Sequence, residues 1–181
     1  MDWYNPPKQW HADGDTITVT TDPSTDFWQI THYGFRRDNG HFYYQEAEGD
    51  FTLDVKIVGA YRDLYDQAGL MVRLDETNWM KCGIEYVNGV QHASAVVTRI
   101  YSDWSVVALA PNPEALWLRV KRSGDALEVS FSLDGGTYTM LRTAYFPTTP
   151  VVQAGIMCAS PDGSGFEARF EGLRLTPVSE E

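Results

Sequence analysis

The sequence is poor in cysteine, in basic residues and in helical periodicity. Its two cysteines, Cys82 and Cys158, both lie in apolar segments, where free thiols are commonly buried, so two buried free thiols are favoured over a disulfide. Lys and Arg number 14 against 25 Asp and Glu, which gives a net charge of −11. Nucleic acids and anionic membranes attract basic surfaces, so we expect neither as a partner. Neutral and cationic ligands remain open.

Signals for a membrane segment or a secretory leader are absent as well. No apolar run approaches the length that crosses a bilayer. No charged and then apolar leader stands before Trp3. We therefore expect the protein to be cytoplasmic.

Metal and cofactor motifs are also missing. The four histidines are scattered, and none has a second histidine two or four residues away, a spacing that metal-ligand sets often show. The sequence contains no phosphate-binding glycine loop, no readable Ser-His-Asp arrangement and no cysteine placed as a nucleophile. We expect no metal and no cofactor.

What the sequence does contain is alternation of apolar and polar residues. In residues 51–57 the odd positions are apolar and the even positions are polar. The same alternation recurs in three later segments, whose apolar positions are Leu116, Leu118 and Val120, then Leu127, Val129, Phe131 and Leu133, then Phe166, Ala168 and Phe170. A period of two turns one face toward a core and the other outward, which is typical of antiparallel sheets.

Turn-forming residues separate these segments at short intervals. Residues that tolerate positive φ occur at Asp13-Gly14, Asp38-Asn39-Gly40, Asn88-Gly89, Ser123-Gly124-Asp125, Asp134-Gly135-Gly136 and Asp162-Gly163. Residues 132–138 predict a β-hairpin. About a dozen strands result, too many for one flat sheet of this length. Residues 1–181 are therefore predicted to form a single all-β domain, a two-sheet antiparallel jelly-roll sandwich.

The outward face is unusual in two neighbouring segments. In residues 65–74 the side chains opposite the expected core are Gln67, Gly69, Met71 and Arg73, preceded by Tyr65 and Asp66. In residues 79–87 they are Trp79, Lys81, Gly83 and Glu85. The mixture of aromatic, cationic and anionic groups is not typical of a solvated face, and the glycines are interpreted as leaving room for a ligand against the sheet.

Two further segments add aromatic and hydrogen-bonding groups. Residues 26–34 include Trp28 and Tyr33, and residues 102–105 include Asp103 and Trp104. Aromatic rings flanked by polar groups suit a sugar, which has an apolar face and a polar rim. A single Trp or Tyr is more often a large core residue, but the coincidence of polar groups over the whole face favours a binding site.

Six motifs in these segments carry a resemblance. They are DFW at 26–28, THYGF at 31–35, DNGH at 38–41, YDQAGL at 65–70, WMK with GIE at 79–85, and SDWS at 102–105. Together, from Trp10 to about Leu175, the sequence resembles a family of unknown function whose fungal members are described as regulators of enolase. Members of that family are similar in fold to concanavalin A-like lectins and glucanases, which implies a jelly roll with a concave sheet. The fungal member implies an accessory role in carbohydrate metabolism.

The carboxylates of the sequence do not match those of known glycosidases. A glycosidase needs two of them about 5–5.5 Å apart if retaining, or about 6.5–9.5 Å apart if inverting. The related glucanases use a Glu-x-Asp-x-x-Glu strand, which this sequence lacks. The nearest pattern, Glu46 and Glu48, runs into a Gly-Asp turn and is interpreted as a solvated strand end. Glu85 would need Asp66 or Asp103 as a partner, so the sequence leans away from an enzyme.

Three functional hypotheses follow. The favoured one is a carbohydrate-binding or carbohydrate-sensing accessory domain, whose ligand-binding candidates are Trp28, Tyr33, His41, Asp66, Gln67, Trp79, Lys81, Glu85, Asp103 and Trp104. The second is a glycosidase-like or other sugar-processing enzyme, in which Glu85 or Asp66 acts as acid or base and Lys81 assists electrostatically. The third, implied by the resemblance, is an interaction module that regulates a metabolic enzyme such as enolase.

Overall fold

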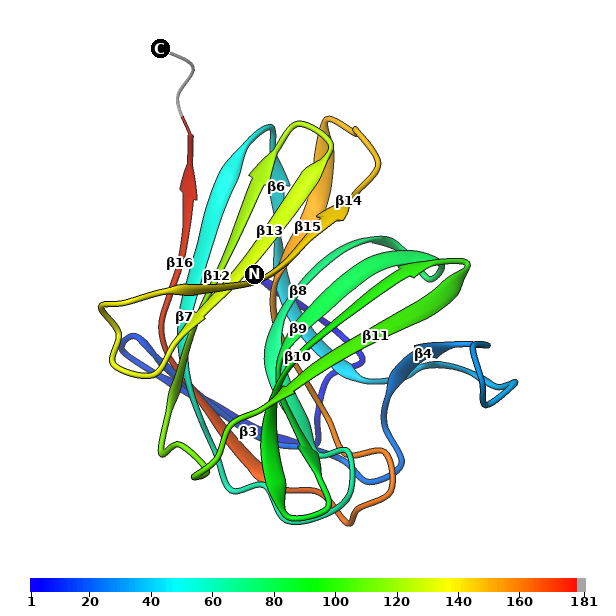
Figure 1. Ribbon diagram of the computed structural model, residues 1–181, viewed down its shortest axis with the longest axis vertical. Coiled ribbons are helices and arrows are strands. Elements are labelled where there is room, and N and C mark those ends of the chain that lie inside the picture. The colour runs from blue at the N-terminus through cyan, green and yellow to red at the C-terminus, as the bar shows by residue number, and fades with distance from the viewer. Residues whose placement is uncertain (179–181) are drawn as a thin grey trace.

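The computed structural model describes residues 1–178, and it contains strands and no helix in that range. Because there is no helix, none of the described residues forms a helical membrane span. The strands form two seven-stranded sheets and one separate two-stranded hairpin. All strand pairs within the two large sheets are antiparallel (Figure 1). The two-sheet antiparallel sandwich predicted from the alternation is confirmed.

The first sheet, sheet A, carries the unusual face. Its strands, in spatial order, are β1 (Asp2–Tyr4), β6 (His41–Glu48), β15 (Val151–Ala159), β8 (Gln67–Asp75), β9 (Asn78–Val87), β10 (Val90–Arg99) and β11 (Tyr101–Ala108). The neighbouring segments predicted over 65–74 and 79–87 are therefore the paired strands β8 and β9. They lie near the middle of the sheet, and β11 is one of its edges.

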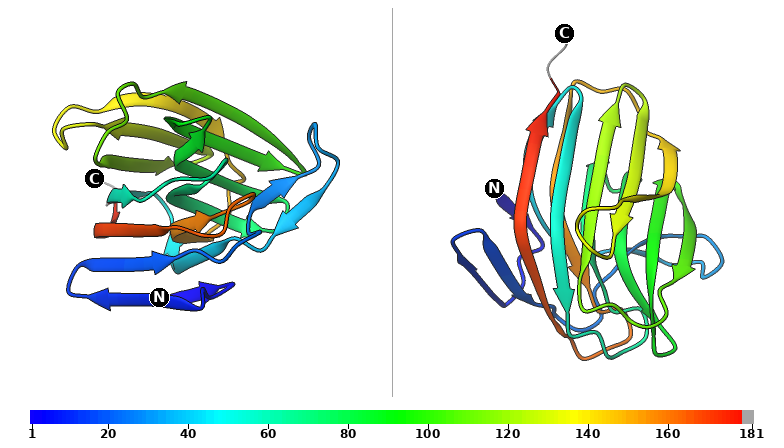
Figure 2. Two further views of the ribbon diagram at one scale, coloured as in Figure 1. Left: turned by 90° about the horizontal axis from the view of Figure 1, so that it is seen from below. Right: turned by 60° about the vertical axis from the view of Figure 1, so that its left-hand side comes forward.

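The second sheet, sheet B, covers the other side of the core. Its strands, in spatial order, are β14 (Thr139–Tyr145), β13 (Ala126–Ser132), β12 (Leu116–Ser123), β7 (Phe51–Gly59), β16 (Glu167–Pro177), β3 (Thr16–Thr20) and β2 (Gln9–Asp13). The right-hand view of Figure 2 shows β16, β7, β12 and β13 side by side. Strands β13 and β14 form the hairpin predicted at residues 132–138.

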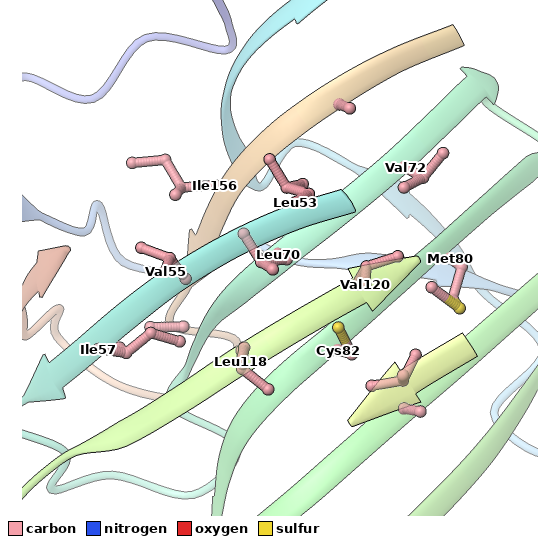
Figure 3. Packing of buried hydrophobic residues seen from close by; sticks show 14 of the residues in the cluster. Leu53, Val55, Ile57, Leu70, Val72, Met80, Cys82, Leu118, Val120 and Ile156 are labelled. Carbon is pink, nitrogen blue, oxygen red and sulfur yellow. The ribbon is translucent and has the colours of Figure 1, made fainter. Parts of the chain in front are cut away.

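The main core lies between the two sheets. Alternate residues of β7 and β12 point toward alternate residues of β8, β9 and β15. Figure 3 shows this packing for Leu53, Val55, Ile57, Leu70, Val72, Met80, Cys82, Leu118, Val120 and Ile156. Burial of one such aliphatic side chain contributes about 1.5–3 kcal/mol. Cys82 and Cys158 are buried free thiols of this core, as expected.

One detail of the strand prediction came out differently. Leu133, predicted to continue the apolar face of β13, lies beyond the last residue of that strand and is 54% exposed. The chain turns at Asp134, whose carboxylate accepts the backbone N–H groups of Gly136 and Thr137, so the alternation ends one position earlier than the sequence pattern suggests. Glu46 and Glu48 are exposed, consistent with a solvated strand end.

The outer face of sheet A is partly covered by the hairpin of β4 (Phe27–Gln29) and β5 (Arg36–Asp38). Figures 1 and 2 show this hairpin beside the sheet rather than within it. A second apolar cluster joins the hairpin to the sheet and consists of Phe27, Trp28, Phe42, Met71, Trp79, Val96 and Met157. Sheet A is therefore apolar on both sides, and only part of its outer face is left for a site.

Two buried ion pairs fix the ends of this hairpin. Asp38, the last residue of β5, receives two hydrogen bonds from the Arg73 guanidinium, at 3.0 and 2.9 Å. Asp26, which precedes β4, pairs with the Lys81 ammonium at 3.2 Å. Both cations belong to the outer face of sheet A, so charge pairing determines where the hairpin lies.

Candidate functional site

The floor of the candidate site is the outer face of β8 and β9. In the register of these strands Gln67 lies opposite Glu85, and Met71 lies opposite Lys81. Directly opposed residues of an antiparallel pair share a face, so the polar groups expected on one face of the two strands do come together there.

Lys81 is a buried structural cation of this floor. It is 5% exposed, and its ammonium donates to the Gln67 side-chain oxygen at 2.6 Å, to the Phe27 carbonyl at 2.7 Å and to Asp26 at 3.2 Å. An ammonium has three donors, and all three are used within the protein. Lys81 therefore holds the start of the hairpin against the sheet.

Glu85 is the buried carboxylate of the floor. It is 8% exposed, and its Oε2 atom accepts hydrogen bonds from Ser94 Oγ and Trp104 Nε1, both at 2.8 Å. Burial raises the pKa of Glu85 above its ordinary value, against the opposing influence of Lys81; nearby Asp26 raises it further. Among residues 1–178, Glu85 takes part in no ion pair.

Aromatic side chains form the walls above this floor. The Trp28 ring meets the Tyr33 ring edge-on at 5.6 Å, and Tyr33 stacks on Phe35 at 5.6 Å. On the opposite side Tyr65 meets Trp104 edge-on at 6.2 Å. The hydroxyl groups of Tyr33 and Tyr65 lie 3.4 Å apart, and this hydrogen bond, together with burial, raises the pKa of Tyr65 to about 12. Tyr65 is therefore a neutral phenol at physiological pH.

Floor and walls enclose a pocket of about 160 Å³ that is open to solvent on one side. Its lining consists of Asp26, Trp28, Tyr33, Phe35, Arg37, Tyr65, Gln67, Lys81, Glu85, Trp104, Pro161 and Asp162. Ligand sites are typically apolar concavities with a few convergent polar groups, and this pocket has that character.

Six of the ten binding candidates chosen from the sequence line the pocket. They are Trp28, Tyr33, Gln67, Lys81, Glu85 and Trp104. The structure places the other four elsewhere. Asp103 is exposed on β11 beside the pocket, in a shallower depression next to Trp104.

The remaining three candidates have buried structural contacts. Trp79 is fully buried under the hairpin and donates its indole N–H to the Glu76 carbonyl. His41 accepts the Asp22 backbone N–H at Nε2. Burial lowers the pKa of His41. Asp66 is fully buried and accepts hydrogen bonds from Ser160 Oγ and from two backbone N–H groups of its own loop.

The glycines of this face have a different role from the one expected. A Cβ atom on Gly69 would overlap the Cys82 carbonyl oxygen, and one on Gly83 would overlap the Ala68 carbonyl oxygen. The two glycines lie opposite each other in the β8–β9 pair. They permit close approach of the two backbones, and the room for a ligand lies above the sheet instead.

Sequence reasoning missed six lining residues: Asp26, Phe35, Arg37, Tyr65, Pro161 and Asp162. Asp26 opens the aromatic segment 26–34, and Tyr65 precedes the strand chosen for the floor, so both lay within segments already singled out. Pro161 and Asp162 reach the pocket from the loop between β15 and β16, where the sequence pattern indicated a turn and gave no sign of a binding residue. Among residues 1–178 no group of three or more His, Cys, Asp or Glu side chains is arranged to hold a metal ion.

Comparison with known proteins identifies the family. Residues 3–178 match the family described as "Protein of unknown function (DUF1349)". The chain belongs to this family. It is 40% identical over 174 residues to "Regulation of enolase protein 1" of Saccharomyces cerevisiae, with 96% of this chain and 88% of the yeast protein covered. The resemblance inferred from the six motifs is confirmed.

Solved structures support the fold. A functionally unknown protein from Saccharomyces cerevisiae matches with a TM-score of 0.94 and 39% identity, over 99% of this chain and 97% of that one. A mutant of a GH43 protein from Bacillus licheniformis matches with a TM-score of 0.72 and 16% identity, and this chain spans 36% of its length and is itself 96% covered. The carbohydrate-binding module CBM66 from Bacillus subtilis matches with a TM-score of 0.60 and 13% identity, over 96% and 94% of the two chains.

The burial of Glu85 predicts a measurable stability effect. Its pKa is raised in the folded protein, so the unfolded chain loses the proton first, and folding becomes less favourable as pH rises from the ordinary Glu pKa of about 4.3 to the raised value. Glu85→Gln keeps an oxygen acceptor for Ser94 and Trp104. We expect the variant to be more stable than wild type at pH 7 and to lose this advantage below about pH 4.

Urea unfolding across this pH range measures the difference. Asp103→Asn, an exposed neighbour, is the matched control and should change little at any pH. Equal stability of Glu85→Gln and wild type at pH 7 would contradict the raised pKa.

Proposed function

We propose that the protein binds a small carbohydrate in the pocket over β8 and β9, and that it acts as a carbohydrate-binding or carbohydrate-sensing accessory protein. The observation that carries this proposal is the combination of aromatic walls with buried carboxylates at one floor. Sugar C–H faces pack on aromatic rings, while hydroxyl groups need hydrogen-bond acceptors and donors.

The hydrogen-bonding capacity of the pocket suits hydroxyl groups. Glu85 Oε1 and Asp26 Oδ2 accept no hydrogen bond from residues 1–178, so both carboxylates retain an acceptor. The Tyr65 phenol is a neutral donor at the rim. Sugar hydroxyl groups can donate to the floor and accept from the rim at the same time.

The relatives support the same class of ligand. A carbohydrate-binding module shares the sandwich fold over nearly its whole length, and a GH43 protein contains a similar region. These similarities are in fold alone, and fold by itself does not imply function. The lining residues of this chain therefore carry the proposal.

A sugar-processing enzyme is the second candidate, favoured by the state of Glu85. Buried carboxylates with a raised pKa beside a lysine are frequent among acid–base catalysts. In this candidate Glu85 is the acid or base. Asp26 replaces Asp66 as the second carboxylate. Asp66 is buried and its oxygens accept hydrogen bonds from Ser160 and from its own loop, whereas Asp26 lines the pocket.

Regulation of a metabolic enzyme is the third candidate, favoured by the name of the yeast relative. The free edge strand β11 offers backbone groups for pairing with another chain. Tyr101 and Val107 on this strand are 57% and 51% exposed, so the edge also presents apolar contact area.

Tyr33→Ala tests sugar binding. Tyr33 is 45% exposed and lines the pocket, so its removal should weaken sugar binding about tenfold or more with little change in thermal stability. Binding is screened on a glycan array and measured by calorimetry. Tyr101→Ala, an exposed tyrosine outside the pocket, should bind as wild type does. Silence of the wild-type protein across the whole array would refute the proposal.

Glu85→Gln tests catalysis. If the protein is an enzyme, this variant should lose turnover by at least about a hundredfold, the scale of general acid–base contributions, while it still binds substrate. Product formation from array-positive sugars is followed by chromatography. Binding without turnover in the wild type would reject this candidate and leave the binding function intact.

Tyr101→Ala also tests the protein-partner candidate. Here Tyr101→Ala is the test variant and Tyr33→Ala is the control. Capture of purified enolase should fall in Tyr101→Ala and persist in Tyr33→Ala, because the edge strand and not the pocket makes the contact. An excess of free sugar should not displace the enolase. Failure of the wild-type protein to capture enolase would rule out this partner.

A further inference from the structure

Glu85 is a buried carboxyl group that forms no ion pair with any of residues 1–178. Lys81, the cation that lowers the pKa of Glu85, forms its ion pair with Asp26 and donates its other hydrogen bonds to Phe27 and Gln67. Glu85 Oε2 receives neutral donors only, from Ser94 and Trp104. Buried carboxylates are normally paired. The position of Glu85 at the floor of an open pocket suggests that the missing cation comes from the ligand.

The surroundings of Glu85 favour a cation. The faces of tyrosine and tryptophan rings attract positive charge, and Trp28, Tyr33, Tyr65 and Trp104 all line the pocket. Asp26, Lys81 and Glu85 together leave the floor with one net negative charge when all three are ionised.

The other charges of the pocket lie at its rim and are of both signs. Arg37 is held there, since its guanidinium lies 5.1 Å from the centre of the Phe35 ring and donates to the Pro161 carbonyl. Asp162 lines the same rim. These two charges offset one another, so the rim does not cancel the negative charge of the floor.

We infer that the ligand of this pocket carries a protonated amine, and that the class of sugar it takes is therefore an amino sugar. The ammonium group donates to Glu85 Oε1, and the sugar ring lies against the aromatic walls. This inference rests on the proposed carbohydrate-binding function and specifies its ligand.

The main alternative is that Glu85 binds as a neutral acid and donates its own proton to a sugar oxygen. The two cases have opposite pH dependence. An ammonium ligand needs the carboxylate, so its affinity falls as pH drops through the raised pKa of Glu85. A neutral sugar that needs the carboxylic acid gains affinity over the same range.

Several groups face Glu85 and enter this pH dependence. From β8 it is faced by Gln67, from β9 by Lys81, from β10 by His92 and Ser94, from β11 by Trp104, and from the loops by Asp26 and Tyr65. His92 is a further titratable group and lies directly opposite Glu85 in the β9–β10 pair, so His92→Gln is measured alongside to separate its contribution.

Calorimetry with matched sugar pairs tests the inference. The probes are glucosamine with glucose, galactosamine with galactose, and mannosamine with mannose, all at neutral pH, together with ethanolamine as a protonated amine without a sugar ring. At least one amino sugar should bind about tenfold or more tightly than its parent, since hydrogen bonds to a charged group are stronger than neutral ones.

Two variants locate the effect. Glu85→Gln should abolish the preference for the amine while thermal unfolding shows that the variant is folded. Asp103→Asn removes an equal charge beside the pocket and should keep the preference. In wild type and in His92→Gln, the affinity for the amino sugar should fall on acidification.

The outcomes separate this inference from the function on which it rests. Equal affinity for every amino sugar and its parent, or a preference that survives Glu85→Gln, overturns the amine inference and leaves carbohydrate binding intact. Binding of ethanolamine alone, lost in Glu85→Gln, supports recognition of an amine and overturns recognition of a sugar. Silence toward every probe overturns both.

Discussion

The buried ammonium of Lys81 is the interaction on which the pocket depends. It projects from the middle of a central strand and holds a carboxylate, a backbone carbonyl and a side-chain amide, all at once. Two of these groups, on Asp26 and Phe27, begin the hairpin that carries the aromatic wall. Breaking a buried ion pair by removing one partner costs about 3–5 kcal/mol, because the remaining charge is left alone. Lys81 therefore contributes to the site by fixing the position of the hairpin. The lysine that the sequence marks on the outer face of the strand has a structural role.

Because Lys81 is used in this contact, its ammonium is not available to a ligand, and this determines which groups of the floor can bind one. With its donors occupied, the floor presents carboxylate oxygens and no free cation, so it recognises groups that donate. The burial of Glu85 remains destabilising, since among residues 1–178 its carboxylate accepts hydrogen bonds from Ser94 and Trp104 and forms no ion pair. Natural proteins retain such destabilising groups where function needs them. Glu85 is the central residue in each hypothesis that involves a ligand, whether the protein binds a neutral sugar, binds an amino sugar or acts on a substrate.

The sequence predicts the strands well because each strand is specified locally. Alternation identified β7, β8, β9 and β12 and the face that Lys81 and Glu85 share. It could not tell Trp79 from Trp104, since both are aromatic residues on the outer face of sheet A. The hairpin β4–β5 buries the first and leaves the second at the pocket, and its position depends on the pair between Asp26 and Lys81, 55 residues apart. Long-range pairing of this kind has no local signature.

The rim of the pocket differs from its floor in how it is held. Ile30 and His32, in the β4–β5 loop that carries Tyr33 and Phe35, have φ values of 63° and 65°, and Tyr65 has a φ of 67°. This region costs such residues about 1–3 kcal/mol each. The strain persists because local contacts fix it, among them the hydrogen bond from the Ile30 backbone N–H to the Phe35 carbonyl and the contact between the Tyr33 and Tyr65 hydroxyl groups. A rim ordered in this way is already shaped when the ligand arrives, which lowers the entropy lost on binding. Strands β8 and β9 thus supply Lys81 and Glu85 of the floor, while the loop residues Tyr33, Phe35 and Tyr65 complete the aromatic walls begun by Trp28 of β4 and Trp104 of β11.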